Sequence, residues 1–519
     1  MKSKDKKKLN RTDIKEIINY IEGEFPVDKW IINGIHIWPI IRIRFFLYYN
    51  DLNKASLSDY VSRETFTNRI IKRLQILKGL SEFVFAYLAD CKKNKRLNKA
   101  DVVFLDYFGI FIKVNNYWYN KFCGPFIDYF NKRGISCFLM TAQHKYFIPR
   151  YHQSMYIQPY LEYIIKKARF ILELKHSWDE KLPKFFDFLD YLESKNLSIQ
   201  NITLPLMRKE IIRIRLMADF FRKLLTKIKP SFVFTVCYDN LVGFAFNLAS
   251  RDIGIPSVEI QHGLQPELHL SYSSWSNVPE KGYELLPSLF WCWSDFEAKI
   301  ILKWCKGVSK WHKPIIGGNL WLDQWLCSSS KFVKRYDEIV LKLKESKKNC
   351  KHILFTQNIP GVENKVLKNI LCVIKNSPPS WFWWIRIHPR QLKNKPKFKK
   401  ILQENKILNC NIDSATDLPL YALLRNIDIH VTYSSSTVIE AEIFGVPSVI
   451  TSSQGGKSFP EQISSGWATC ANTPEDIIKA IKNQLERKNI INKNQKKRHI
   501  QQNEALEYLL KLVKNKLTI

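Results

Sequence analysis

The stretch between residues 427 and 451 constrains the fold of this chain more than any other part of the sequence. Ile427–Thr432 is rich in β-branched residues, which is typical of a buried strand. Ser434–Thr437 supply hydroxyl groups and helix-capping residues, Val438–Phe444 is predicted to be a helix, and Pro447–Thr451 a second strand. Such a unit points backbone N–H groups and the positive end of a helix dipole at one spot, which favours an anion such as phosphate. An alternative is an ordinary strand–helix–strand unit whose serines only cap the helix.

The same alternation of buried strands and helices occurs in two parts of the chain. In the first part, helical segments separate the apolar runs Asp101–Leu105, Ser231–Cys237 and Ser257–Ile260. In the second part, Lys351–Thr356 and Trp381–Ile387 precede the stretch described above. Strands that alternate with helices favour a doubly wound parallel sheet. The sequence therefore predicts an α/β protein with two Rossmann-like, doubly wound parallel-sheet domains that face a cleft.

The length of 519 residues is too great for one ordinary core and fits two or three domains. The region before residue 100 is rich in helix formers, with helical periodicity at Asp13–Ile21 and Thr67–Leu88. The polar, Lys-rich segment Ser328–Lys348 is predicted to be the linker between the two sheets. The predicted parts are a helical N-terminal extension (1–99), a first Rossmann-like domain (100–327), a second Rossmann-like domain (328–490) and a C-terminal helix (491–519).

The chain is strongly basic, with 81 Lys and Arg against 48 Asp and Glu and a formal net charge of +33. Such a charge attracts an anionic partner, which includes nucleic acid, an anionic membrane surface and phosphorylated substrates. A second explanation is compositional, since much of the charge is Lys accompanied by Asn and Ile, the bias of an AT-rich genome. The sequence contains no nucleic-acid recognition motif and no zinc-finger spacing, which argues against a nucleic-acid-binding protein.

The 11 cysteines include no CxxC pair and no Cys/His cluster at metal spacing, which argues against a disulfide framework or a zinc site. The basic start of the chain leads into a polar, amphipathic segment, so we expect no secretion signal. The apolar stretches are short or interrupted by charges, so none is expected to span a bilayer. We therefore predict a cytoplasmic location, with binding to the inner face of the cell membrane as an open alternative.

A histidine follows one of the predicted strands of the first half. His262 comes directly after Ser257–Ile260 and Gln261, and Gly263 after it lets a ligand approach the backbone. An imidazole titrates near neutral pH, so His262 is a candidate general base or phosphate ligand. His269 and Tyr272 are expected to lie near it. The alternative is a histidine that is only hydrogen-bonded in a turn.

A second set of polar residues follows the strand at Asp101–Leu105. Asp106, Asn115 and Asn116 belong to a predicted loop from 106 to 116, and a helix is predicted over Tyr117–Arg133. Ligands of doubly wound sheets bind at the carboxyl ends of the strands, so these polar groups are candidate ligand contacts. The alternative is a solvated loop.

Polar side chains also follow the predicted strands of the second half. Gln357 comes after Lys351–Thr356, Arg386 and His388 lie at the end of Trp381–Ile387, and Ser434–Thr437 follow Ile427–Thr432. The carboxyl ends of parallel strands meet at one edge of a sheet, so we expect these groups to converge. Imidazole, guanidinium and hydroxyl groups at a helix N-terminus are suited to bind a diphosphate.

The layout of residues 100–490 resembles that of GT-B glycosyltransferases. His388-Pro389 followed by Ser434-Ser435-Ser436 resembles the His-Pro and Ser-Ser/Thr motifs of bacterial sialyltransferases and related capsule enzymes. Gln261-His262-Gly263, together with those motifs, resembles teichoic-acid glycerophosphate polymerases and capsule or O-antigen transferases. The acidic Asp/Glu-Asp/Glu-Gly motif that supplies the sialyltransferase base is absent from the sequence, which leaves His262 or Asp106 as candidate bases.

This resemblance implies a glycosyltransferase that moves a sugar from a nucleotide-sugar donor to a glycan or a polyprenyl-diphosphate-linked acceptor in capsule or O-antigen synthesis. The first Rossmann-like domain would hold the acceptor and the second the donor, with Glu440 on the ribose hydroxyls or, alternatively, only on the helix face. The predicted donor-binding residues are Gln357, Arg386, His388, Pro389, Arg390, Ser434, Ser435, Ser436, Thr437 and Glu440. The predicted acceptor-binding residues are Asn115, Asn116, Gln261 and His269.

The sequence has no Asp-x-Asp motif, so transfer without a metal ion and without a cofactor is expected. The next candidate activity is transfer of a polyol phosphate in place of a sugar. Candidates from other classes are a non-catalytic scaffold with the same fold and a nucleic-acid-binding protein.

Overall fold

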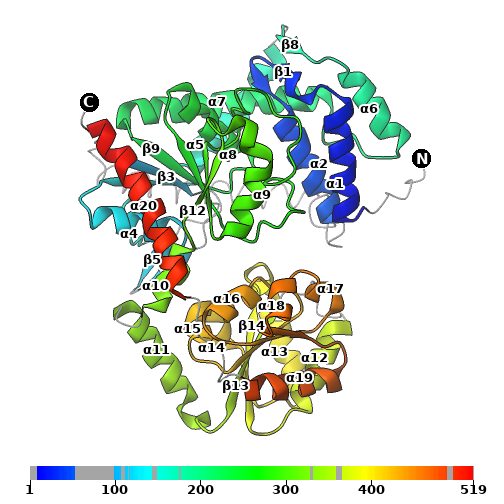
Figure 1. The fold of residues 1–519 in the computed structure, drawn as a ribbon, viewed down its shortest axis with the longest axis vertical. Coiled ribbons are helices and arrows are strands. Elements are labelled where there is room, and N and C mark those ends of the chain that lie inside the picture. Colours follow the sequence, from blue (N-terminus) through cyan, green and yellow to red (C-terminus); the bar gives the residue numbers. More distant parts are fainter. Residues whose placement is uncertain are drawn as a thin grey trace. The chain divides into compact units, whose positions relative to one another are not determined.

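The computed structural model describes residues 9–52, 99–106, 111–114, 116–142, 149–174, 177–327, 331–357, 365–487 and 495–517. The chain divides into two compact units (Figure 1). The first is Met1–Gly318 together with His499–Ile519, and the second is Asn319–Arg498. The first Rossmann-like domain was predicted to end at residue 327, and residues 491–519 were predicted to be a separate helix.

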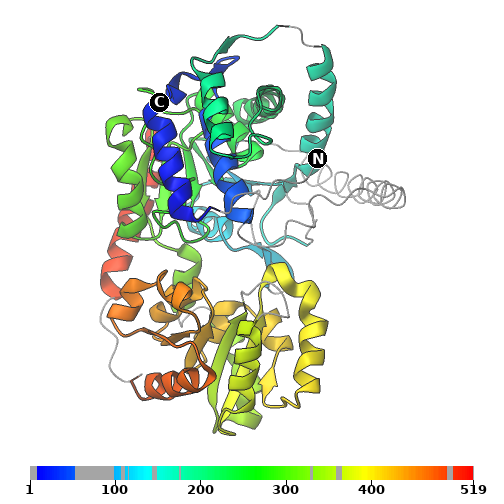
Figure 2. The same cartoon turned by 90° about the vertical axis from the view of Figure 1, so that its right-hand side faces the viewer.

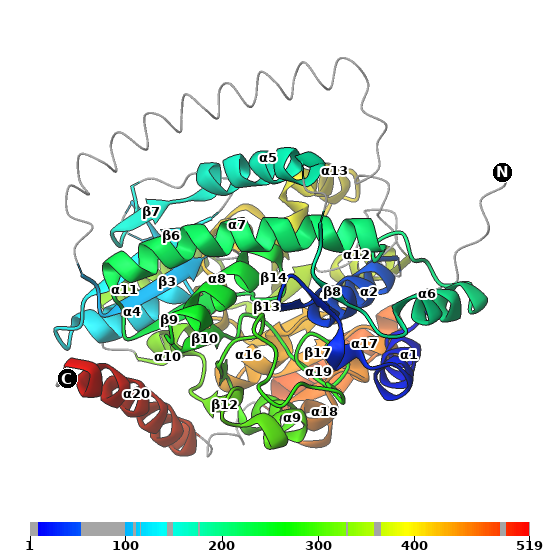
Figure 3. The same cartoon turned by 90° about the horizontal axis from the view of Figure 1, so that it is seen from above.

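Among the described residues of the first unit, seven strands form a parallel sheet in the order β12-β11-β10-β9-β3-β6-β7. The central strands are apolar runs buried on both faces, as expected where helices cover both sides of a sheet. Helix α7 packs between α5 and α8 (Figure 3). The strands are β3 (Val102–Asp106), β6 (Cys137–Thr141), β7 (Ser154–Tyr156), β9 (Phe232–Val236), β10 (Ser257–Ile260), β11 (Leu289–Cys292) and β12 (Lys313–Ile316). The helices are α4 (Cys123–Asn131), α5 (Gln158–Leu174), α6 (Phe185–Ser194), α7 (Leu204–Ile228), α8 (Leu241–Asp252) and α9 (Asp295–Cys305).

The N-terminal segment is part of the first unit's core. Helix α1 (Arg11–Glu24) begins with a capping box between Asn10 and Asp13, and α2 spans Trp38–Leu52. Buried residues of these two helices belong to the same hydrophobic cluster as residues of the seven-stranded sheet. Between them, the short strands β1 (Ile31–Ile32) and β2 (Ile35–His36) form a small antiparallel sheet with β8 (Glu180–Lys181). The helix predicted at Thr67–Leu88 lies outside the described residues.

The prediction of a loop to residue 116 and a helix from Tyr117 was wrong. The chain forms an antiparallel hairpin of β4 (Phe111–Val114) and β5 (Tyr117–Asn120), and the helix begins only at Cys123. Asn116 has a φ of 68°, the left-handed conformation that asparagine tolerates in a tight turn. The aromatic residues of β5 have high strand propensity, and this outweighed the helical periodicity.

Among the described residues of the second unit, six strands form a parallel sheet in the order β15-β14-β13-β16-β17-β18. Figure 2 shows helices on either side of this sheet. Ile353 and Phe355 of β13 pack in one cluster with α12 and α19. The strands are β13 (Lys351–Gln357), β14 (Trp381–Ile387), β15 (Cys410–Asn411), β16 (Ile429–Thr432), β17 (Ser448–Ile450) and β18 (Ala468–Cys470). The helices are α10 (Leu320–Leu326), α11 (Lys331–Lys344), α12 (Lys365–Lys375), α13 (Lys395–Glu404), α14 (Asp413–Asp417), α15 (Leu420–Leu424), α16 (Thr437–Ile443), α17 (Ser453–Gly456), α18 (Pro460–Ser464) and α19 (Pro474–Arg487).

The Lys-rich segment predicted to be a linker is largely helix α11. Val333 and Val340 of this helix are buried, and Asp337 accepts hydrogen bonds from Nε and Nη2 of Arg425 at 3.0 and 2.7 Å. The prediction failed because the apolar positions of an amphipathic helix are few among many lysines, so the segment has the composition of a loop.

After the second unit, the chain returns to the first. Helix α20 (Gln495–Leu517) buries Leu506, Leu509 and Val513, and Lys313 at the start of β12 donates a hydrogen bond to the Tyr508 hydroxyl at 2.9 Å. The predicted fold class is confirmed, since each unit contains a Rossmann-like, doubly wound parallel sheet, as in GT-B-type proteins.

Candidate functional site

Three neighbouring strands of the first unit end in polar residues. Strand β9 lies between β3 and β10, with Val236 level with Asp106 on one side and Ile260 on the other. The chain after β9 continues to Asp239, and the chain after β10 continues to His262. Asp106, Asp239 and His262 therefore leave the same edge of the sheet, the edge at which doubly wound sheets bind ligands.

The His262 side chain lies at this edge and is 17% exposed. Its Nδ1 is 3.9 Å from Oε1 of Glu259, and its ring stands edge-on to Phe122 with 6.3 Å between centroids. Burial lowers the pKa of His262, and the negative charge of Asp239 opposes that shift. An imidazole whose pKa is below 6.5 is mainly neutral at pH 7, which is the form that accepts a proton.

Two carboxylic acids that the sequence analysis missed lie beside this histidine. Glu259 is 1% exposed, and its Oε1 accepts a hydrogen bond from the Tyr272 hydroxyl at 2.6 Å. Burial raises the pKa of Glu259 well above its usual value. Asp239 accepts hydrogen bonds from the Ser271 hydroxyl at 2.7 Å and from the Cys237 thiol at 3.0 Å. Asp239 lies three residues after the end of β9, so the strand-end criterion applied to Asp106 would have identified it. Glu259 lies inside an apolar strand and gave no such signal.

Asp106, the alternative base, is fully buried. One of its carboxylate oxygens accepts a hydrogen bond from Asn120 at 2.7 Å. The other end of the Asn120 side chain accepts from the backbone N–H groups of Phe122 and Cys123, where helix α4 begins. Asp106 is therefore part of the structure that holds the hairpin and α4 against the sheet.

The residues predicted to bind the acceptor substrate differ in their burial and their contacts. Gln261 is buried and joins the ends of β10 and β11, since its amide donates to the Gly263 carbonyl at 2.9 Å and accepts from the Trp293 N–H at 2.7 Å. His269 packs against Tyr272, and burial lowers its pKa to about 4. Asn116 is exposed at the hairpin turn, and Asn115 lies outside the described residues. The structure thus brings His262, His269 and Tyr272 together.

The second unit carries polar strand ends on three adjacent strands. Gln357 ends the central strand β13, and the register places it level with Ile387 of β14. On its other side, Thr356 is level with Thr432 of β16. His388, directly after β14, is exposed, and Ser434 follows β16 two residues after its end. These residues therefore lie along one carboxyl edge, as the sequence predicted for parallel strands.

Two of the residues predicted to bind the donor are used inside the unit. Arg386 donates from Nη1 to the carbonyls of Ala415 and Leu418 at 2.7 and 2.6 Å, and burial lowers its pKa to about 10. Gln357 is buried and donates to Gln391 at 2.7 Å. Pro389 and Arg390 begin the 3-10 turn η5 (Pro389–Asn394).

The serine turn begins helix α16, which starts at Thr437, one residue before the predicted start. Ser435 supplies the cap, since its Oγ accepts from the Thr437 N–H at 3.3 Å and lies 2.9 Å from the Thr437 hydroxyl oxygen. Ser436 is exposed and its side chain makes no capping hydrogen bond. Glu440, on the first turn of the helix, accepts from the Tyr421 hydroxyl at 2.6 Å, and its charge acts to raise the pKa of Arg386.

In the part of the chain that the structure describes, no group of three or more His, Cys, Asp or Glu side chains is arranged to hold a metal ion. None of the described helices is both long enough and apolar enough to cross a membrane.

Neither a family model nor a curated protein sequence matches this chain. Among solved structures, it is similar to UDP-GlcNAc 2-epimerase from Neisseria meningitidis, bound to UDP-GlcNAc (17% identity, 80% of this chain, 99% of that chain, TM-score 0.47). It is also similar to UDP-GlcNAc 2-epimerase from Methanocaldococcus jannaschii (16% identity, 74% of this chain, 92% of that chain, TM-score 0.43). A third is HepE from Anabaena in complex with UDP (11% identity, 80% of this chain, 98% of that chain, TM-score 0.40). At these scores the function has to be inferred from the side chains of this chain.

Proposed function

We propose that this chain is a nucleotide-sugar-dependent glycosyltransferase that acts without a metal ion, with His262 as the general base. The observation that carries the proposal is the histidine at the carboxyl ends of β9 and β10. Burial keeps its imidazole neutral at pH 7, and it lies near two carboxylic acids. A neutral imidazole accepts a proton readily, and a neighbouring carboxylate stabilises the imidazolium that forms.

In the proposed reaction, the imidazole of His262 removes the proton from an acceptor hydroxyl. The hydroxyl oxygen then forms a bond to the anomeric carbon of the donor sugar, while the bond between that carbon and the phosphate oxygen breaks. The nucleotide leaves with the electron pair, and His262 later releases its proton to solvent. Asp239 offsets the positive charge of the ring while it carries the proton.

The charge that develops on the leaving phosphate needs donors that are already in place. We assign this part to the second unit, with the exposed His388 and the hydroxyls and N–H groups of Ser434, Ser435, Ser436 and Thr437. Pro389 and Arg390 follow His388, and Glu440 is assigned to the ribose hydroxyls. Arg386 and Gln357 are assigned a supporting role, because both already hold other parts of the unit.

The acceptor in this proposal is a glycan or a polyprenyl-diphosphate-linked sugar of capsule or O-antigen synthesis. The charge of +33 suits an anionic lipid carrier and contact with the inner face of an anionic membrane. His269 and the exposed hairpin turn at Asn116 are assigned to this substrate.

A thermal-shift screen of the full chain against CMP, CDP, UDP, GDP and their sugars tests the proposal. A ligand at about 100 times its Kd stabilises the protein by about 2.7 kcal/mol, a readily measured shift. We expect a selective shift with the nucleotides of one base. Absence of a shift with every compound would refute the proposal and favour a scaffold. Salt-dependent binding of a DNA duplex without any nucleotide effect would favour nucleic-acid binding.

Transfer of a polyol phosphate is a second candidate, because Gln261-His262-Gly263 resembles the motif of the glycerophosphate polymerases. CDP-glycerol in the same screen separates the two. A shift with CDP-glycerol that exceeds the shift with CDP would favour this second activity.

A further inference from the structure

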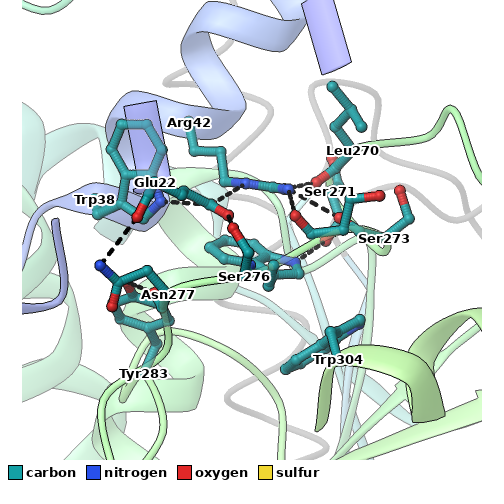
Figure 4. A network of polar contacts seen from close by, with 12 residues as sticks. Glu22, Trp38, Arg42, Leu270, Ser271, Ser273, Ser276, Asn277, Tyr283 and Trp304 are labelled. Atoms are coloured by element: carbon teal, nitrogen blue, oxygen red, sulfur yellow. Dashed lines mark hydrogen bonds and ion pairs between the residues drawn. The ribbon is translucent and has the colours of Figure 1, made fainter. Parts of the chain in front are cut away.

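The N-terminal helices hold a loop of the His262 site through a buried ion pair (Figure 4). Arg42 of α2 is fully buried, and its Nε donates to Oε1 of Glu22 in α1 at 2.8 Å. Its Nη2 donates to the carbonyls of Ser273 and Ser274, both at 2.8 Å, and its Nη1 donates to the Leu270 carbonyl. The guanidinium also lies over the Trp275 ring, 4.1 Å from its centroid.

Glu22 completes the attachment from the other side. Its Oε2 accepts from the backbone N–H and the hydroxyl of Ser276 at 2.7 and 2.6 Å, and its Oε1 also accepts from the Trp38 indole at 2.8 Å. The backbone carbonyl of Glu22 accepts from Asn277 at 3.2 Å. A buried ion pair is often no more stabilising than a well-packed apolar pair, because its charges have lost their hydration. Its geometry is specific, however, and here it fixes the backbone of residues 270–277.

The residues that this pair encloses are the ones that contact the acids beside His262. Ser271 and Tyr272 lie between Leu270 and Ser273, whose carbonyls Arg42 binds. The Ser271 hydroxyl donates to Asp239 at 2.7 Å, and the Tyr272 hydroxyl donates to Glu259 at 2.6 Å. The loop backbone is also held from α9, since the Trp304 indole donates to the Tyr272 carbonyl at 2.9 Å.

We infer that Arg42 and Glu22 are positioning residues for the His262 site, acting through Ser271 on Asp239 and through Tyr272 on Glu259. The N-terminal helices are therefore part of the machinery of the first unit, a role that goes beyond the function proposed above. The effect on activity rests on that proposed function, whereas the effect on His262 itself does not.

The ionisable groups that act on this site come from every element around it. They are Cys237, Tyr238 and Asp239 after β9, Glu259 in β10, Lys121 before α4, His269 and Tyr272 in the loop, and Arg11 of α1. Asp239 is the charge that raises the pKa of His262 against the effect of burial. If Asp239 loses the hydrogen bond from Ser271, its effect on the ring weakens and the pKa of His262 falls.

The test is a titration of the full chain labelled with ¹³C at the histidine Cε1 and followed by NMR, with the His262 signal assigned from its loss in His262→Gln. Asp239→Asn removes the negative charge and should lower the titration midpoint of His262. The shift in this variant is the reference for the shifts in the other variants. Ser271→Ala and Arg42→Lys should shift the midpoint in the same direction. Ser271→Ala removes a single hydroxyl and tests the link from the loop to Asp239, and Glu22→Gln tests the ion pair from its other side if Arg42→Lys does not fold.

Arg44→Lys is the matched control, because Arg44 lies on the same helix but is directed to other partners, pairing with Glu210 at 3.0 Å and donating to the Asn201 carbonyl at 3.4 Å. Its His262 midpoint should equal that of the wild type. The inference is overturned if Ser271→Ala titrates like the wild type, or if Arg42→Lys (or Glu22→Gln, where Arg42→Lys does not fold) does so.

A second measurement uses the nucleotide sugar that the thermal-shift screen identifies. Ser271→Ala and Tyr272→Phe should lower kcat by about tenfold, a part of what a general base contributes, and leave KM for the donor within about twofold. Unchanged kcat in both variants would overturn the inference. If no nucleotide sugar binds at all, the proposed function fails, while the histidine titration still tests the positioning role.

Discussion

Replacement of Arg42 by methionine should destabilise the first unit far more than the same change at Arg44. The Arg42 side chain is fully buried, and its loss leaves the fully buried carboxylate of Glu22 without a cation and the carbonyls of residues 270, 273 and 274 without a donor. Breaking a buried pair in this way costs about 3–5 kcal/mol. At about 2 °C per kcal/mol for a large unit, Arg42→Met should lower Tm by roughly 6–10 °C.

Arg44→Met provides the comparison on the same helix. The Arg44 side chain is 26% exposed, and its partner Glu210 keeps a second ion pair with Arg213 at 3.0 Å. The expected cost is about 1 kcal/mol, or roughly 2 °C. Differential scanning calorimetry of both variants at one pH and one protein concentration measures the difference. A Tm for Arg42→Met within about 2 °C of that for Arg44→Met would refute the reasoning.

The double variant Glu22→Gln/Arg42→Met separates lost charge from lost hydrogen bonds. The introduced glutamine keeps one acceptor oxygen, which can serve either the Trp38 indole or the Ser276 N–H, and no buried charge would remain unpaired. The double variant should therefore be more stable than the sum of the two single effects predicts, by about 2 kcal/mol. Additive effects would mean that the pair contributes only through its separate hydrogen bonds.

Three further predictions concern the two strand-end sites and pH. His388→Ala should weaken donor binding at least about tenfold with Tm unchanged, since it removes an exposed phosphate ligand; equal affinity by calorimetry would remove His388 from the site. His262→Ala should lower kcat by about 10²–10⁴ with donor affinity unchanged; unchanged turnover would exclude His262 as the base. The pKa of His312 is lowered to about 4 and that of His430 to about 3, because both are fully buried. The unfolded chain therefore binds these protons first, so their contribution to stability is complete above pH 6.5 and is lost as the pH falls toward 4. Urea unfolding at pH 7 and pH 4.5 should differ by about 2–3 kcal/mol for each histidine, and His430→Asn should reduce that difference; equal loss in wild type and variant would contradict this.

The sequence predicted the central strands of both sheets because they are continuous apolar runs that helices cover on both faces, whereas the short edge strands β7, β15 and β18 were not predicted. β10 and β14 have the predicted bounds, and β9 and β16 differ only at their ends. The edge at which polar residues collect follows from the parallel order, so His262, His388 and the serine turn could be placed without knowledge of side-chain contacts.

The sequence could not show which of these polar side chains form hydrogen bonds to other parts of the fold. Arg386 binds the carbonyls of Ala415 and Leu418, and Gln261 binds Trp293, and such partners become known only when the chain is folded. The importance of Glu259 was missed for the same reason, whereas Asp239 could have been found from its position after β9. Both acquire their surroundings from the loop at residues 270–277, which the N-terminal helices hold in place.

Helix α20 has a consequence for the order in which this protein is made. The first unit consists of two separate stretches of the chain, and the second unit lies between them. Because a ribosome synthesises the chain from its N-terminus, α20 emerges only after the whole second unit has been made. Until then, the surface of the first unit that receives Leu506, Leu509 and Val513 stays uncovered. Apolar surface exposed during synthesis favours aggregation, so the nascent first unit is at risk for as long as the ribosome needs to make the second unit.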